Sequence, residues 1–271
     1  MDYFKNKIVW ITGASSGIGL ETARRLSTAG ARLVISARRA AVLEDVKASL
    51  AKPENVLVVP IDLESPQHFE EATRKVIDHF GGIDILINNA GISQRSYVVD
   101  TDLSVDKRIM EINYFGTVAL TKAVLPHMLE AGGGHFVTVT SLVGKFGFGV
   151  RSAYAASKHA LHGFFESLHI ELYGRGIRVS LVCPGPVQTP ISLNALDGAG
   201  KPTGEMDDMQ KKGMPVDRAV DIMLQGVSIG KKEIIIGSFK EKLGVRLKAW
   251  MPSVFFKMAL KQNPRGEVKL K

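Results

Sequence analysis

The chain lacks the features that mark secreted and membrane-spanning proteins. Its 271 residues include one cysteine, Cys183, so no disulfide can form within the chain, and the surrounding apolar run VSLVC predicts a small buried side chain. No run of eighteen apolar residues occurs, and we expect no segment that crosses a bilayer. The start, MDYFKNK, leads directly into the strand-like IVWITG, which predicts no cleaved leader. We therefore expect a cytoplasmic protein.

Metal-ligand clusters and repeats are missing as well. The seven histidines and the cysteine do not have the spacing of metal ligands, and we predict no metal site. The chain does have enough apolar residues, 45% of the total, for a sizeable core. At this length one domain is expected.

Basic charge is concentrated at one end of the chain. Residues 240–271 hold nine Lys or Arg against two Glu, out of 35 basic and 27 acidic residues in all. The other 239 residues, with 26 basic and 25 acidic groups, are nearly neutral. We predict one domain over residues 1–239 and a basic amphipathic extension over residues 240–271.

Short β-branched runs alternate with helix-length amphipathic stretches along most of the chain. Continuous apolar strands separated by helices are typical of a parallel sheet that is covered on both faces. The pattern predicts an α/β fold, a doubly wound sheet of seven parallel strands with helices on both faces, plus a C-terminal amphipathic helical extension. The expected strands are residues 7–11, 32–36, 56–60, 84–88, 135–141, 178–183 and 233–237.

Residues 190–215 interrupt this rhythm. The segment contains four glycines, three prolines and few apolar residues, and it is long for a connection without structure of its own. A lid over a site and a solvated insertion are both compatible with this composition.

A glycine-rich turn follows the first expected strand and opens directly into a helix, in the order Thr12-Gly13-Ala14-Ser15-Ser16-Gly17-Ile18-Gly19. Glycines permit a tight turn and the close approach of a diphosphate, and the free N–H groups of the helix start favour the anion. In this setting the turn predicts dinucleotide binding. Ser16 can also cap the helix, which does not exclude a phosphate contact.

The end of the second expected strand has no carboxylate. NAD-binding folds commonly place one about twenty residues beyond the turn, against the adenosine ribose. Here the strand ends in Arg38 and Arg39, and the next acid is Glu44. These guanidinium groups can grip a 2′-phosphate; the alternative is a solvated helix start, where cations oppose the helix dipole. We predict NADP(H) as the cofactor, with NAD(H) less favoured.

Ser141, Tyr154 and Lys158 have a spacing that suits acid/base catalysis. Tyr154 and Lys158 share one helix face, and Ser141 can approach from the preceding strand end. A phenol with a pKa of about 10 is a poor base at neutral pH, but a nearby cation favours the phenolate. Tyr-x-x-x-Lys alone is common on ordinary amphipathic helices, so the other motifs must decide.

Taken together, these motifs resemble the classical short-chain dehydrogenases/reductases over about residues 6–237. The segment after Thr189 and the basic tail are most similar to the hydroxysteroid-dehydrogenase-like branch. The resemblance implies a Rossmann fold and hydride transfer between NADP(H) and a ketone or secondary alcohol. The other motifs that carry it are Asp62-Leu63, Asn88-Asn89-Ala90-Gly91, Asn113 and Pro184-Gly185.

The resemblance also implies a role for each of these residues. Tyr154 is the general acid or base, Lys158 lowers its pKa and holds the nicotinamide ribose, and Ser141 bonds the substrate oxygen. Asn113 completes the catalytic set by keeping a water in a proton relay. The residues implied at the cofactor are Gly13, Ser15, Ser16, Gly17, Ile18, Gly19, Arg38, Arg39, Asp62, Leu63, Asn89, Ala90, Gly91, Tyr154, Lys158, Pro184, Gly185, Val187 and Thr189.

Apolar residues around the expected site favour an apolar, lipid-like or steroid-like substrate, although the same residues can be ordinary core. They are Leu142, Val143, Phe146, Phe148, Val150, Ile191, Leu193, Met206 and Met209.

The tail FKEKLGVRLKAWMPSVFFKMALK has apolar residues at helical intervals among basic ones, with Pro252 expected to separate two short helices. We expect its apolar stripe to dock on the domain or on a second subunit. Peripheral membrane contact through residues 240–262 is the alternative. The resemblance further implies a homodimer or homotetramer, paired through the helices of Asn113 and Tyr154.

Two other kinds of function remain to be weighed. A non-catalytic protein that senses NADP(H) would keep the fold without turnover, but the intact serine, tyrosine and lysine argue against it. Nucleic-acid binding through the tail would need stacking or groove-reading motifs, and the tail has none, so we expect no nucleic-acid partner.

Overall fold

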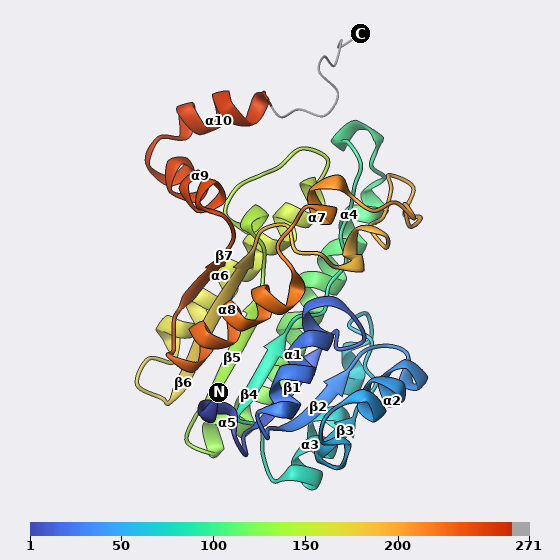
Figure 1. Cartoon of the computed structure of the whole chain (residues 1–271), viewed down its shortest axis with the longest axis vertical. Helices are drawn as coiled ribbons and strands as arrows, with labels where there is room; N and C mark the ends of the chain where they lie inside the picture. The colour runs from blue at the N-terminus through green and yellow to red at the C-terminus, as the bar shows by residue number, and fades with distance from the viewer. Residues whose placement is uncertain (262–271) are drawn as a thin grey trace.

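A computed structural model of the protein describes residues 1–261 and shows one parallel sheet between two layers of helices (Figure 1). The seven strands lie in the order β3-β2-β1-β4-β5-β6-β7, and every pairing is parallel. The order reverses between β1 and β4, so the carboxyl ends of these two strands diverge into a crevice. The strands are β1 (Ile8–Thr12), β2 (Arg32–Ser36), β3 (Val56–Val58), β4 (Ile85–Asn88), β5 (Gly134–Val139), β6 (Ile177–Pro184) and β7 (Glu233–Ile236).

All seven strands predicted from the sequence are present, and the sheet confirms the predicted fold class. Most ends agree within one or two residues, and the ladder of β3 stops before Pro60, which has no backbone N–H to donate. Neighbouring residues of β1 point to opposite faces: Val9 and Ile11 lie in one core cluster, and Trp10 lies in the other.

Helices cover both faces of the sheet. On the Val9 and Ile11 face lie α1 (Gly17–Thr28), α2 (Ala40–Ser49) and α8 (Val216–Ser228). On the Trp10 face lie α3 (Phe69–Phe80), α5 (Thr117–Glu130) and α6 (Ser152–Glu171). The remaining helix of this part, α4 (Leu103–Met110), runs into a π-helical turn at Glu111–Gly116 and packs against α6.

The lid segment, residues 190–215, packs onto the domain. Ala195 and Leu196 are buried, and Leu196 exchanges backbone hydrogen bonds with the loop after β4, donating to Ser93 and accepting from Arg95, both at 2.8 Å. The segment ends in the short helix α7 (Asp208–Lys211). The middle of the segment is therefore buried against the domain.

The C-terminal extension forms two helices, α9 (Phe239–Trp250) and α10 (Pro252–Leu260), which project past the end of the sheet (Figure 1). Pro252 separates them, as the sequence predicts. Ser238 and Glu241 form a reciprocal capping box that fixes where α9 begins. Residues 262–271 of the predicted extension, including residue 262 of the predicted membrane-contact segment, lie outside the described residues. Among residues 1–261 no helix is both long and apolar enough to span a bilayer.

Candidate active site

A single pocket of about 1220 Å³ opens at the carboxyl ends of the strands, where the strand order reverses. It runs from the turn after β1 and the end of β2, past the ends of β4, β5 and β6, to α9 and α10. Ligands of open α/β sheets bind at this position.

The glycine-rich turn lines the pocket next to the start of α1. Gly13 and Gly17 have φ angles of +67° and +55°, which side chains other than glycine rarely adopt. A Cβ on Gly13 would come within 2.9 Å of the backbone of Ala90, and one on Gly19 would collide with the carbonyl oxygen of Gly13. Ser16 is the N-cap residue of α1, but its side chain makes no capping hydrogen bond, so its hydroxyl is available to an anion.

Two guanidinium groups lie at the far end of the pocket. Arg38 and Arg39 follow β2 directly, line the pocket and are exposed. Asp62 and Leu63, in the loop after β3, line the same pocket. The Asp62 carboxylate accepts the backbone N–H of Glu64 at 3.1 Å, which holds this loop in a turn.

The loop after β4 is tied to the glycine-rich turn. The Thr12 hydroxyl accepts the backbone N–H groups of Asn89 and Ala90, each at 3.0 Å, and the Asn89 amide donates to the Thr12 carbonyl at 2.9 Å. Asn88 instead points into the core and donates to Thr121 at 3.1 Å. Thr12 and Asn88 therefore connect the ends of the strands to neighbouring parts of the fold.

Ser141, Tyr154 and Lys158 meet in the middle of the pocket. Ser141 follows β5, while Tyr154 and Lys158 lie one turn apart on α6. The Ser141 hydroxyl is hydrogen-bonded with Tyr154 and also lies within 3.4 Å of the Pro184 carbonyl oxygen. The Lys158 ammonium lies 5.7 Å from the centre of the Tyr154 ring. A substrate oxygen between Ser141 and Tyr154 would contact two hydroxyl groups at once.

Burial has the largest effect on the pKa values of Tyr154 and Lys158. It raises the pKa of Tyr154 above its usual value, and the nearby Arg151 guanidinium and the hydrogen bond with Ser141 offset only part of the rise. Burial also lowers the pKa of Lys158 to about 8. Lys158 is therefore poised near neutral pH, whereas Tyr154 is held in its protonated form.

Asn113 lies behind the pocket, in the π-helical turn Glu111–Gly116. Its amide group donates to the Ile92 carbonyl at 2.9 Å and to the Ser157 hydroxyl at 3.0 Å, and its oxygen accepts the Ile92 N–H at 2.8 Å. A Cβ on Gly91 would lie 3.0 Å from this oxygen and 3.5 Å from the Lys158 nitrogen. Asn113 thus connects the loop after β4 to α6, at the residue next to Lys158.

Comparison with known proteins decides the family. The family model for short chain dehydrogenases matches residues 7–200. The chain belongs to the short-chain dehydrogenase family. It is accordingly an oxidoreductase of a family that uses NAD(P), as its resemblance to this family implied.

Relatives match over nearly the whole chain. Human dehydrogenase/reductase SDR family member 7 is 46% identical over 253 residues, which are 91% of this chain and 74% of the human protein. Bovine dehydrogenase/reductase SDR family member 7B is 42% identical over 264 residues, or 94% and 81% of the two chains. Among solved structures, a short-chain dehydrogenase of Burkholderia cenocepacia in complex with NADP has a TM-score of 0.79 at 25% identity and covers 95% of this chain and 98% of that one. One from Burkholderia phymatum in complex with NAD has a TM-score of 0.81 at 21% identity, with all of both chains covered.

In this short-chain dehydrogenase the pocket gathers nearly all the residues that the sequence singles out. Gly19 and Asn113 do not line it: Gly19 packs α1 against the turn, and Asn113 acts from behind. Of the apolar residues expected near the substrate, Val150, Leu193 and Met206 are also outside the lining. Those that do line the pocket are Leu142, Val143, Phe146, Phe148, Ile191 and Met209.

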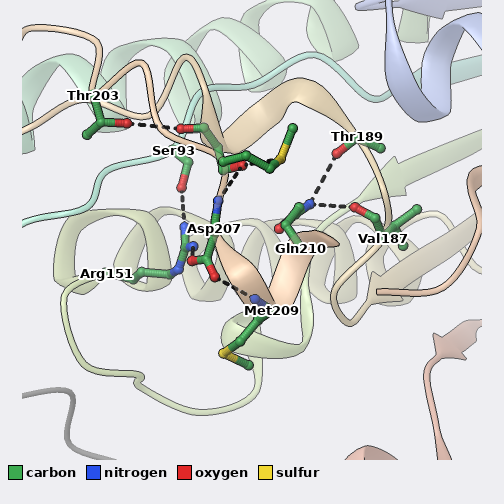
Figure 2. A network of polar contacts seen from close by, with 10 residues as sticks. Ser93, Arg151, Val187, Thr189, Thr203, Asp207, Met209 and Gln210 are labelled. Carbon is green, nitrogen blue, oxygen red and sulfur yellow. Dashed lines mark hydrogen bonds and ion pairs between the residues drawn. The ribbon is translucent and has the colours of Figure 1, made fainter. Parts of the chain in front are cut away.

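Several pocket residues have no counterpart in the sequence-based prediction, and two groups of them extend the site most. One is Arg151, which lies one turn before Tyr154 and donates to Ser93 and Asp207 (Figure 2). Its position three residues before the tyrosine is the only sequence signal that could have drawn attention to it. The other comes from the C-terminal helices and comprises Lys240, Glu241, Leu243, Gly244, Leu247, Phe255, Met258 and Ala259.

Among the described residues, one group of possible metal ligands comes together, although the sequence predicts none: His162, Cys183 and Glu233. Each of these already has a protein partner. The Thr140 hydroxyl contacts both Cys183 and His162, and Glu233 pairs with Lys145 at 2.5 Å. Burial raises the pKa of the Cys183 thiol to about 11 and lowers that of His162. The polar atoms of these three residues are therefore held by hydrogen bonds and an ion pair within the protein.

Proposed function

We propose that this dehydrogenase transfers a hydride between NADP(H) and the ketone or secondary alcohol of an apolar, lipid-like or steroid-like substrate, with Tyr154 as general acid/base. One observation carries the proposal. The same pocket has two arginines at one end, the Ser141, Tyr154 and Lys158 group in the middle, and an apolar end built in part by α9 and α10.

The choice of NADP(H) is supported by the charges at the end of β2. Arg38 and Arg39 form no ion pair within residues 1–261, and the strand end has no carboxylate to accept ribose hydroxyls. A 2′-phosphate there would meet two planar guanidinium groups. The diphosphate fits the turn at the start of α1, where Gly13 and Gly17 leave the backbone bare.

The chemistry follows from what each side chain can do. The nicotinamide, when bound, gives or takes the hydride. In reduction, Tyr154 is protonated, in keeping with its raised pKa, and donates its proton to the oxygen that Ser141 also holds. In oxidation Tyr154 must first lose that proton, which nearby positive charge assists. Lys158 and Arg151 are the cations of the pocket lining that lie near Tyr154.

An apolar substrate is supported by the composition of the open end. Its lining includes Leu142, Phe146 and Phe148 together with Leu243, Leu247 and Phe255 of the C-terminal helices. Of the charged groups near this end, Arg151 is already paired with Asp207, so it is not free to bind a substrate carboxylate. A hydrocarbon skeleton would bury apolar surface here at roughly 25 cal/mol per Å².

The outer surface of α9 and α10 supports peripheral contact with an anionic membrane, from which such a substrate could enter. Trp250 and Leu260 are 84% and 73% exposed, far more than soluble surfaces usually leave such residues. Lys242, Arg246 and Lys257 are interleaved with them. Only Phe255 of α10 is buried, so docking of this helix on the domain covers a small part of its apolar surface.

The assembly that we propose is a homodimer or homotetramer in the cytoplasm or at the surface of a membrane. Phe115, next to Asn113, and Ile170 and Tyr173, at the end of α6, are large apolar side chains left exposed by the single chain. Pairing of these helices would cover them.

A turnover screen tests the proposed function. Purified protein is assayed with NADPH and with NADH against a panel of apolar and polar ketones and the matching alcohols. We expect NADPH-dependent reduction of apolar ketones, lost by more than about 100-fold in Tyr154→Phe while NADPH binding is retained. Turnover near that of the wild type in this variant would refute the role of Tyr154, and preference for polar ketones would refute the substrate class.

A further inference from the structure

Two side chains of the lid segment, Asp207 and Gln210, bind residues outside it (Figure 2). Asp207 forms an ion pair with Arg151 at 2.8 Å, and Gln210 donates to the Val187 carbonyl at 2.6 Å and to the Thr189 hydroxyl at 3.1 Å. Arg151 is the N-cap residue of the helix that carries Tyr154 and Lys158. The part of the lid around α7 is thus attached both to the start of α6, the helix that carries Tyr154 and Lys158, and to the loop after β6.

Arg151 is fixed from both sides. Its second guanidinium nitrogen donates to Ser93 at 2.7 Å, in the loop after β4. The side chains of Arg151 and Asp207 are only 15% and 14% exposed, so their attraction is less screened than that of a surface pair. The other carboxylate oxygen of Asp207 accepts the Met209 N–H at 2.9 Å, and Asp207 is thereby also the N-cap of α7.

We propose that the Asp207–Arg151 ion pair is a latch that couples lid closure to catalysis: with the lid shut, the guanidinium is held beside Tyr154, and with the lid open, it is released. Arg151 is then a positioning residue, and the acid/base group is fully assembled only over a covered pocket. The proposal concerns the same site as the proposed function, and its catalytic part rests on Tyr154 acting as the acid/base.

The charges around Tyr154 make this coupling measurable. Arg151 and Lys158 on α6 are the cations that line the pocket near the phenol, Asp207 of the lid is the anion, and Ser141 after β5 is the hydrogen-bonding partner. The Arg151 charge lowers the pKa of Tyr154 against the larger effect of burial. Release of Arg151 must therefore raise that pKa further.

Asp207→Asn breaks the latch with little other change. If the amide oxygen keeps its bond to the Met209 N–H, the amide nitrogen takes the place of the oxygen that faces Arg151, so that a donor meets a donor. The matched control is Asp208→Asn, since the neighbouring Asp208 is exposed and pairs only with Lys211 at the surface.

Two measurements on the full chain decide the question. The first is the rate of tryptic cleavage after Lys212, identified by peptide mass, with no substrate present. We expect it to rise at least about fivefold in Asp207→Asn and to stay unchanged in Asp208→Asn. An equal rate in the two variants would show that the ion pair does not hold the lid, and this result does not depend on turnover.

The second is the ionisation of Tyr154, followed as tyrosinate absorbance in the NADP⁺ complex after subtraction of the Tyr154→Phe counterpart. If Arg151 stayed in place, loss of the Asp207 charge would lower the midpoint pH; if Arg151 is released, we expect the midpoint to rise by about half a pH unit or more. A lowered or unchanged midpoint would overturn the positioning role. A raised midpoint in a protein that turns over no ketone would uphold the latch and refute the proposed function.

Discussion

Lys158, buried within α6, donates its ammonium hydrogen to the backbone carbonyl oxygen of Val139 at 3.0 Å. One neutral carbonyl does not replace the hydration that the charge loses on burial, and the pKa of Lys158 falls to about 8 as a result. The residue that the proposed chemistry needs in charged form therefore destabilises the fold. Removing the Lys158 charge should therefore raise the free energy of unfolding and lower the activity.

Lys158→Met should stabilise the protein near neutral pH. In the unfolded chain this lysine binds its proton up to its ordinary pKa, so unfolding takes up a proton between about pH 8 and pH 10.5. The cost of the buried charge is thus fully present below pH 8 and disappears as the pH rises towards 10.5. We expect a gain of about 3 kcal/mol at pH 7 in urea unfolding, a smaller gain at pH 10, and almost no turnover.

The opposite result would be informative. If Lys158→Met unfolded at lower urea concentration than the wild type at pH 7, the bond to Val139 would outweigh the desolvation of the charge. Lys122→Met, on α5 and exposed, controls for the general effect of removing a lysine.

The strands and the cofactor turn could be predicted because their signals are local. A buried parallel strand is a continuous apolar run, and a phosphate-binding turn requires glycines at fixed positions, as Gly13 and Gly17 show by their positive φ angles. Tyr154 and Lys158 are likewise set by helical spacing. Each of these features is decided within about ten residues.

The latch and the apolar end of the pocket could not be predicted, because they depend on contacts between distant segments. Ser93, Arg151 and Asp207 are each more than fifty residues apart and meet only once the sheet order is fixed. The π-helical turn around Asn113 also has no local signal, since the apolar pattern runs through it without a break. The amphipathic tail indicated that α9 and α10 form, but not that Leu243 and Phe255 line the pocket.

Arg38→Asp should shift cofactor preference towards NAD(H). The substitution removes a guanidinium that can bind the 2′-phosphate and adds a carboxylate that can bind ribose hydroxyls. We expect the ratio of kcat/KM for NADPH over NADH to fall at least about tenfold. Arg24→Asp, outside the pocket on α1, is the control, and an unchanged ratio in Arg38→Asp would rule out Arg38 as the phosphate ligand.

The C-terminal helices should decide liposome association. Trp250→Glu places a charge at the most exposed apolar position of α9 and α10, and we expect at least about a tenfold loss of binding to vesicles rich in anionic lipid. Ile229→Glu, at a residue that is also exposed but lies just after α8, should bind as the wild type does. Unchanged association of a chain truncated after residue 240 would exclude the membrane role of this segment.

Phe255 should contribute to substrate affinity from outside the part of the chain that resembles the family. Its ring lies 5.0 Å from that of Phe146, and both rings line the pocket. An aromatic pair contributes about 0.5–1.5 kcal/mol beyond the area that it buries, so Phe255→Ala should lower kcat/KM for apolar ketones by about tenfold. The dissociation constant of NADPH should not change, because the arginines and the turn lie at the other end of the pocket.

Phe256→Ala is the control, because it removes a neighbouring ring that is half-exposed and is absent from the lining. Equal losses in the two variants would mean that α10 acts through its fold and not through contact with substrate.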